Sequence, residues 1–178
     1  NRKIRQAYKG EILSIFGGPH VTYFPELIYQ AYVDAVFRGE CEAAIVNFID
    51  RLEAKKEIYT VKNAWVKDLD DPGVIHKNPT RELIDNINSI VFPDRKLISE
   101  YLHRQFSFHT FLSSRGCPYN CSYCFNKAYR KLYHDDGHTF RRRSVDNIIE
   151  ELAIVKHEYP LEHASFQDDE FCGSAEWL

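Results

Sequence analysis

Residues 106–124 read FSFHTFLSSRGCPYNCSYC and hold three of the chain's five cysteines. The aromatic-rich run Phe106–Leu112 predicts a β-strand, because aromatic residues are favoured in strands. The strand leads into cysteines spaced CxxxCxxC, which are Cys117, Cys121 and Cys124. Thiols crowded into so short a loop favour a metal site over disulfide cross-links in a reducing compartment. The stretch therefore predicts a strand that ends in a metal-binding loop.

The residues that follow this loop complete one predicted βαβ unit. Ser144 is suited to cap a helix that ends near Tyr159-Pro160. The apolar residues of this helix fall on one face, namely Val145, Ile148, Ile149, Leu152 and Val155. Leu161–Gln167 predicts the next strand, and the acidic loop Asp168-Asp169-Glu170 comes directly after it. Because ligand groups gather at the carboxyl ends of parallel strands, we expect the acids and the cysteines at one edge of the sheet.

The first part of the chain alternates predicted strands with predicted helices, a pattern typical of an open α/β sheet. Buried strands are predicted at Glu11–Phe16 and Val33–Phe37, and Gly17-Gly18-Pro19 closes the first of them. One helix is predicted from Pro25 to Tyr32 and another over Ala43–Leu52. The second helix has an apolar stripe made of Ala44, Ile45, Phe48, Ile49 and Leu52.

The middle of the chain is less regular. A strand is predicted within Ile58–Val66, and Val74–Ile75 is expected to pair back on it across a turn at Asp68–Gly73. The stretch Asn78–Arg95 carries two prolines and reads as a connector. We therefore expect an α/β domain over residues 1–55, an inter-domain connector over 56–105 and a second α/β unit over 106–178.

The composition excludes several classes of protein. The chain has 178 residues, is 44% apolar and 28% charged, and has a formal net charge of −3. No global basic field recruits nucleic acid, and no apolar run is long enough to span a bilayer, so we expect a cytoplasmic protein. The basic run Arg141–Arg143 is expected to be solvated or to pair with nearby acids. The chain contains no methionine and begins inside a predicted helix, so we expect it to be an internal segment of a longer protein.

The cysteine loop itself leaves two kinds of metal site open. Thiolates bind iron–sulfur clusters and zinc alike. A structural zinc site would need a fourth ligand, for which His109, His134 and His138 are the candidates. Such sites usually pair two short cysteine knuckles, and the chain has only one, so we favour a cluster held by three cysteines with one iron left open. Cys41 and Cys172 are interpreted as buried or incidental thiols.

The stretch Ser114–Cys124 resembles the motif of the radical S-adenosylmethionine (SAM) superfamily, CxxxCxΦC, where Φ is aromatic. The resemblance implies a 4Fe–4S cluster on Cys117, Cys121 and Cys124, with Tyr123 in the aromatic position beside the adenine of SAM. It implies reductive cleavage of SAM to methionine and a 5′-deoxyadenosyl radical. No individual catalytic residue is assigned.

The run Phe166–Phe171 resembles the F-x-D-D-x-F form of the cobalamin-binding branch of that superfamily. The resemblance implies that Asp168, Asp169 and Glu170 meet the amino group of SAM, although an acidic surface turn would read the same way. It also implies that Gly17 and Gly18 let the backbone approach the nucleotide tail of cobalamin. The cobalt-ligating histidine of this branch would precede Asn1, and His20 does not stand in its position.

The resemblance implies an α/β fold in which the C-terminal part of a Rossmann-like cobalamin-binding domain precedes the first βαβ unit of a partial (β/α)6 radical SAM barrel. The implied function is that of a cobalamin-dependent radical SAM enzyme, in a branch where methyl transfer is the commonest chemistry. A flavodoxin or ferredoxin would supply electrons, no membrane or nucleic-acid partner is expected, and the substrate cannot be read. The alternatives are a methylthiotransferase-type radical SAM enzyme and a non-catalytic zinc module on the same cysteines.

Overall fold

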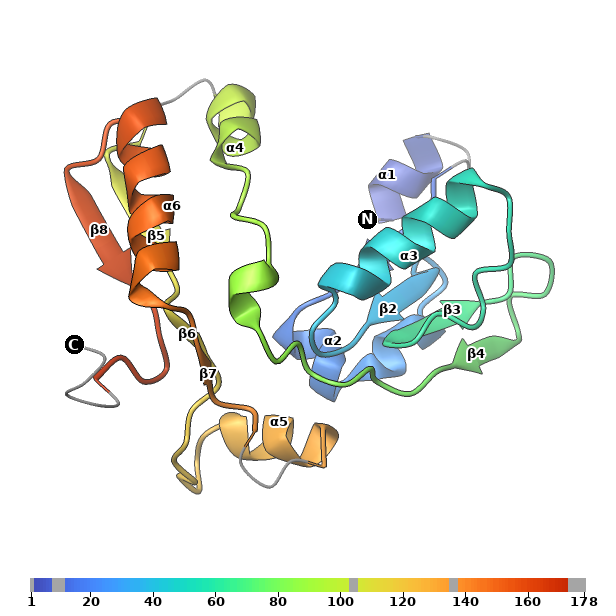
Figure 1. Ribbon diagram of the computed structural model, residues 1–178. Coiled ribbons are helices and arrows are strands. Elements are labelled where there is room, and N and C mark those ends of the chain that lie inside the picture. The colour runs from blue at the N-terminus through green and yellow to red at the C-terminus, as the bar shows by residue number, and fades with distance from the viewer. Residues whose placement is uncertain (1, 8–11, 103–105, 135–137, 173–178) are drawn as a thin grey trace. The chain divides into compact units, whose positions relative to one another are not determined.

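The computed structural model describes residues 2–7, 12–102, 106–134 and 138–172 (Figure 1). The chain divides into two compact units, one made of residues 1–83 with 131–133 and the other of residues 84–130 with 134–178. Within the described residues, no helix has both the length and the apolar character needed to cross a membrane.

The first unit contains one four-stranded mixed sheet with the order β1-β2-β3-β4. Its strands are β1 (Ile15–Phe16), β2 (Ala35–Phe37), β3 (Ala64–Lys67) and β4 (Ile75–Lys77). The first two strands are parallel, with Ile15 opposite Ala35, whereas β3 and β4 continue the sheet as an antiparallel hairpin. The predicted pairing of Ile75 back on the preceding strand is thus confirmed. Both strands of this hairpin come from the segment that we expected to be a connector.

The helices of the first unit are α1 (Arg2–Ala7), α2 (Pro19–Tyr23), the 3₁₀ helix η1 (Pro25–Tyr29) and α3 (Glu42–Glu53). The prediction of a helix from Pro25 to Tyr32 is only partly right, because this segment is a short 3₁₀ turn. Helix α2 was not predicted; Pro19 is its first residue and directly follows Gly18. Proline fits there because the first helical turn has no use for its missing N–H.

The core of the first unit lies between α3 and the sheet. Ala44 and Phe48 are buried, and the ring of Phe48 meets that of Phe37 edge-on at 5.3 Å between centroids. The predicted apolar stripe is wider than the buried face, since Ile49 and Leu52 are 42% and 39% exposed. Helical spacing shows which residues share a face but not how far the sheet reaches beneath it.

The turn between β3 and β4 is organised by Asp68. One of its carboxylate oxygens accepts hydrogen bonds from the backbone N–H groups of Asp70 and Asp71, at 2.9 and 3.1 Å. The other lies 3.1 Å from Nε2 of His76, whose ring stacks on Tyr59. The hydrogen bond with His76, followed by the backbone N–H groups, holds the pKa of Asp68 below its ordinary value.

The second unit contains a parallel strand pair and a short antiparallel ribbon. Its elements are η2 (Ile87–Ser89), α4 (Arg95–Leu102), β5 (Phe108–Phe111), β6 (Ser114–Arg115), α5 (Asn126–Leu132, whose last residues group with the first unit), β7 (Arg141–Arg142), α6 (Val145–Glu158) and β8 (His163–Phe166). Strand β5 pairs with β8 in parallel, from Phe108 opposite His163 to Phe111 opposite Phe166, and α6 connects them. This arrangement is the predicted βαβ unit.

Helix α6 begins where the sequence predicts. The Ser144 hydroxyl accepts a hydrogen bond from the backbone N–H of Asn147 at 3.3 Å, which is an N-cap. Ile148 and Val155 are buried as expected, whereas Val145 and Ile149 are 45% and 56% exposed. The stripe is again wider than the buried face.

The ribbon of β6 and β7 was not predicted. It places Ser114 opposite Arg142 and Arg115 opposite Arg141, so the first two arginines of the basic run form a strand. The turn after β6 requires glycine, because Gly116 has φ of +76° and a Cβ there would lie 2.4 Å from the carbonyl oxygen of Thr139. The cysteine loop therefore starts from a tight backbone crossing.

Candidate functional site

The cysteine loop leaves β6 and enters α5. Cys117 and Cys124 are half-buried and Cys121 is exposed. A turn joins the last two cysteines, since the N–H of Cys124 donates to the carbonyl of Cys121 at 3.2 Å. Among the residues that the structure describes, no three histidine, cysteine or carboxylate side chains converge as a metal site. The candidate ligands are the three thiols of this one loop, and three thiolates are a ligand set that suits an iron–sulfur cluster.

The zinc alternative needs one of three histidines as a fourth ligand, and these differ in their surroundings. His109 lies in β5 and is only 8% exposed, and its Nε2 is 3.1 Å from the carbonyl oxygen of Pro160. The ring also packs against that of Tyr159, so His109 has a structural role inside the βαβ unit. His134 and His138 are both exposed, so they are the histidines left to the zinc alternative.

Asp168 fixes the point at which the loop starts. Its carboxylate accepts hydrogen bonds from the N–H of Ser113 at 2.9 and 3.1 Å, from the Ser113 hydroxyl at 3.0 Å and from the Ser114 hydroxyl at 2.5 Å. Both serines are buried. Since Asp168 follows β8 and the serines follow β5, the carboxylate joins the carboxyl ends of the two parallel strands. The acidic loop and the root of the cysteine loop therefore lie together, as predicted.

Asn126 links the acidic loop to the last cysteine. Its side-chain nitrogen donates to Oδ2 of Asp169 at 3.1 Å and to the Cys124 sulfur at 3.6 Å. The residue is 4% exposed. Sequence reasoning missed Asn126, although a polar residue at a helix start two positions after the third cysteine is a usable signal.

Two other predicted contact residues differ in their surroundings. Tyr123 is 91% exposed and presents its ring to the outside of the loop. Glu170 is half-buried, and its backbone carbonyl accepts a hydrogen bond from the Ser114 hydroxyl at 3.3 Å. Within the described part of the chain, the Glu170 carboxylate has no hydrogen-bond or ion-pair partner.

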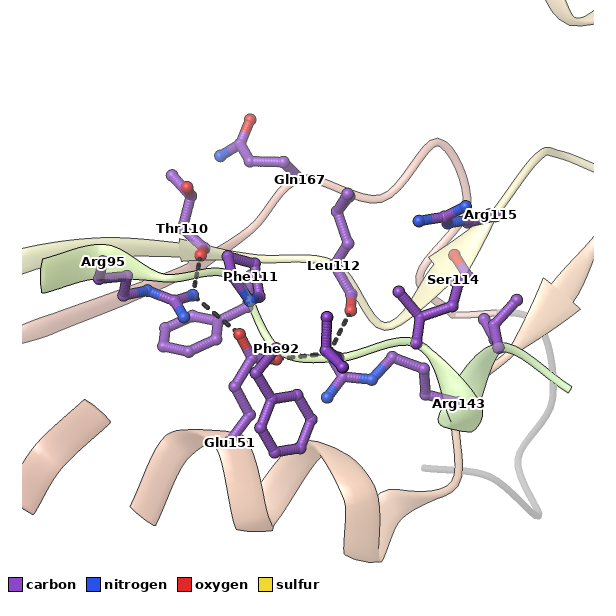
Figure 2. Close-up of a pocket in the computed structure, with 14 residues that line it drawn as sticks. Phe92, Arg95, Thr110, Phe111, Leu112, Ser114, Arg115, Arg143, Glu151 and Gln167 are labelled. Atoms are coloured by element: carbon purple, nitrogen blue, oxygen red, sulfur yellow. Dashed lines mark hydrogen bonds and ion pairs between the residues drawn. The ribbon is translucent and has the colours of Figure 1, made fainter. Parts of the chain in front are cut away.

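A buried carboxylate that the sequence did not reveal stabilises the βαβ unit (Figure 2). Glu151 of α6 forms ion pairs with Arg95 at 2.9 Å and with Arg143 at 2.5 Å, and its side chain is 3% exposed. The two guanidinium groups also donate to the carbonyl oxygens of Thr110 and Leu112. The expectation that the basic run pairs with nearby acids is confirmed for Arg143. These residues line a cavity of about 430 Å³ in this unit.

The glycines of the first unit stand at the carboxyl end of β1. Gly18 has φ of +92°, and a Cβ added at Gly17 or Gly18 would meet nothing within 4 Å. The buried Thr22 ties this loop to the one after β2, because its hydroxyl donates to the Gly18 carbonyl at 2.9 Å and accepts from the N–H of Gly39 at 3.0 Å. Two adjacent strand ends thus lie together; the backbone is open at Gly17 and Gly18, whereas the Tyr133 side chain covers Gly39.

The two cysteines outside the loop, Cys41 and Cys172, were interpreted as buried or incidental thiols, and they differ in exposure. Cys41 is half-buried beside the Gly39 carbonyl, with 3.1 Å between its sulfur and that oxygen. Burial, followed by the charges of Glu42 and Glu40, raises the pKa of Cys41 to about 12. Cys172 is exposed.

Comparisons with known proteins find this chain similar to a methyltransferase and to a cyclase, both much longer than the chain. No family model matches it. It is 32% identical over 173 residues to an uncharacterized methyltransferase of Pyrococcus horikoshii, covering 95% of this chain and 36% of that protein. It is 26% identical to the anaerobic magnesium-protoporphyrin IX monomethyl ester cyclase of Cereibacter sphaeroides, covering 89% of this chain and 26% of the cyclase. The chain thus spans about a third of the length of the first relative and less of the second.

The solved structures that share this fold are larger enzymes. One is the cobalamin-dependent SAM radical enzyme OxsB, with a TM-score of 0.69, 19% identity and coverage of 97% of this chain and 23% of OxsB. Another is the radical SAM methyltransferase TsrM of Kitasatospora setae, with a TM-score of 0.65, 14% identity and coverage of 98% and 33%. By sequence the chain is therefore similar to a methyltransferase and a cyclase, and by fold it is similar to cobalamin-dependent radical SAM enzymes.

Proposed function

We propose that the chain is part of a cytoplasmic, cobalamin-dependent radical SAM enzyme that transfers a methyl group. The observation that carries the proposal is the position of the cysteine loop, whose root is held by Asp168 at the carboxyl ends of β5 and β8. This is where parallel α/β sheets bind ligands. A methyltransferase relative supports the methyl transfer, and the cyclase relative is the reason to test the product directly.

Cys117, Cys121 and Cys124 would hold the cluster, since three thiols leave the open iron that SAM requires. A 4Fe–4S cluster bound there supplies the electron that cleaves SAM reductively. The exposed ring of Tyr123 is available to pack on the adenine. An external electron donor of the flavodoxin or ferredoxin type is part of the proposal, because reductive cleavage of SAM consumes an electron.

We assign different roles to the three acidic residues Asp168, Asp169 and Glu170. The Asp168 carboxylate already accepts hydrogen bonds from three donor groups of two serines, namely the Ser113 N–H and the hydroxyls of Ser113 and Ser114, which reduces its capacity for a ligand. One oxygen of Asp169 accepts from Asn126. Glu170, whose carboxylate has no partner among the described residues, is therefore the first choice to accept hydrogen bonds from the SAM ammonium group, and Asp169 is the second. Asp168 acts as the clamp that positions both.

The barrel of this proposal begins at β5. The amides of His163 in β8 and of Gln167 just after it bond to the carbonyls of Ser107 and Phe111, so the carbonyls of Thr110 and Leu112 point to the opposite edge of β5. Arg95 and Arg143 occupy those two carbonyls. A side chain on a strand's free edge prevents another strand from pairing there. This capping supports a partial (β/α)6 barrel that starts with β5 and does not close against it.

The cobalamin part of the proposal rests on the first unit. The open loop after β1, which Thr22 joins to the loop after β2, fits the approach of a nucleotide tail to Gly17 and Gly18. A Cβ at Gly17 would meet no atom of the described residues within 4 Å, so packing within the described chain does not require glycine there. We assign no cobalt ligand.

An anaerobic assay tests this proposal. The protein is loaded with iron, sulfide and cobalamin and is then supplied with reductant and SAM. We expect formation of methionine and 5′-deoxyadenosine, and cobalamin that stays bound through gel filtration. Glu170→Gln should raise the KM for SAM more than it lowers kcat, because it removes a binding contact. A protein that keeps its cluster but never cleaves SAM would exclude the enzyme function, and one that never retains cobalamin would exclude the cobalamin part alone.

A further inference from the structure

We propose that Asn126 is a positioning residue that sets the redox potential of the cluster through a hydrogen bond to the Cys124 sulfur. The inference rests on the proposed function, since it requires a cluster on the three cysteines. Asn126 stands at the first residue of α5 and is 4% exposed. A buried amide must use its hydrogen-bonding groups, and the two acceptors that face its nitrogen are a carboxylate and a sulfur.

The carboxylate fixes the orientation of the amide. An ionised carboxylate only accepts hydrogen bonds, so the group that faces Oδ2 of Asp169 at 3.1 Å has to be the NH₂ and not the carbonyl of Asn126. The same nitrogen lies 3.6 Å from the Cys124 sulfur, a distance suited to an N–H···S hydrogen bond. One amide hydrogen is used by Asp169 and the second is therefore directed at the sulfur.

This arrangement has a consequence for a thiolate that binds iron. Hydrogen bonds to the sulfur atoms of a cluster, together with solvent exposure and net charge, set its reduction potential. A donor at Cys124 withdraws negative charge from the sulfur and favours the reduced cluster. Asp169 takes part indirectly, because it holds the amide in the orientation that donates. The acidic loop thus influences the reduction potential of the cluster as well as the binding of SAM.

The test compares Asn126→Leu, which keeps the size of the side chain and removes both donors, with Asn120→Leu. Asn120 lies in the same loop, is exposed and has no hydrogen-bond partner among the described residues. Each variant is reconstituted anaerobically, assayed for iron and sulfide, and titrated for its midpoint potential by EPR and visible absorption. We expect both variants to hold as much iron and sulfide as the wild type. The potential should shift to a more negative value in Asn126→Leu only.

A cluster in Asn126→Leu with the potential of the wild type would overturn the inference and leave the proposed function intact. A wild-type protein that binds zinc and no cluster would overturn the proposed function, and the inference with it. If Asn126→Leu does not fold or hold a cluster, pulsed EPR of the reduced wild type labelled with ¹⁵N in its asparagine side chains decides. A nitrogen coupling that survives in Asn120→Leu supports the inference, and no coupling overturns it.

Discussion

Replacing Glu151 with glutamine tests the ion-pair cluster that holds α6 to β5. The carboxylate lies 2.9 Å from Arg95 and 2.5 Å from Arg143, and the three side chains are 3%, 13% and 12% exposed. Glu151→Gln keeps the shape of the side chain but removes the only charge that we find between the two guanidinium groups in the described residues. Two like charges would then face a neutral amide at the buried face of α6.

The expected cost follows from the hydrogen bonds that change. A hydrogen bond to a charged group contributes about 1.5–3 kcal/mol, and two bonds between ionised groups become at most one bond from an arginine to a neutral amide oxygen. The arginines keep their bonds to the carbonyls of Thr110 and Leu112, which limits the loss. We therefore expect a cost of about 3 kcal/mol, the lower end of the roughly 3–5 kcal/mol typical of breaking a buried ion pair.

Hydrogen exchange of the α6 amides, followed by mass spectrometry, measures this cost where it arises. A loss of about 3 kcal/mol corresponds to exchange that is about a hundredfold faster, since 1.4 kcal/mol is a factor of ten. The matched control is Glu150→Gln, because Glu150 is an exposed neighbour in the same helix and should change stability by no more than about 0.5 kcal/mol. Equal exchange rates in Glu151→Gln and Glu150→Gln would refute the reasoning.

Three further outcomes are expected elsewhere in the molecule. Because the pKa of Cys41 is raised to about 12 and the thiolate is the reactive form, iodoacetamide at pH 8 should label Cys172 and leave Cys41 unmodified in the folded protein; rapid labelling of Cys41 would contradict the assigned burial. The pKa of Asp68 is lowered in the folded state, so its contribution to stability is present above its unfolded pKa and is lost as the pH falls through the folded value. The difference in free energy of unfolding between wild type and Asp68→Asn should therefore disappear in acid, and a difference that persists there would argue against the bond with His76. Asn63 has φ of 72° and its buried side chain makes hydrogen bonds to the backbone of Arg38, Glu40 and Arg81, so Asn63→Ala should cost about 4 kcal/mol in urea denaturation, whereas a cost below about 1 kcal/mol would show that this loop is held in another way.

Local patterns were enough to predict the elements that are built from neighbouring residues. The Ser144 cap, the parallel pairing of β5 with β8 and the β3–β4 hairpin are confirmed. Each follows from hydrophobic periodicity or from turn chemistry within one segment. The division into a domain, a connector and a partial barrel stays a prediction.

The features that were missed depend on contacts distant in sequence. The β6–β7 ribbon pairs polar residues that have no strand pattern, and it is possible because Gly116 lets the backbone reach Thr139. Glu151 interrupts the apolar face of α6 and reads as a solvent-facing residue until Arg95 and Arg143 are brought to it. In the same way, no local pattern shows that Asp168 is taken up by two serines about fifty residues earlier.

The content of metal on the cysteine loop tests the central claim most directly. The protein is purified anaerobically, reconstituted with iron and sulfide in the presence of competing zinc, and assayed for all three elements in wild type and Cys121→Ala. We predict about four iron and four sulfide per chain in the wild type, with the absorption and EPR of a 4Fe–4S cluster, and their loss in Cys121→Ala. One equivalent of zinc with no iron or sulfide retained in the wild type would contradict the account.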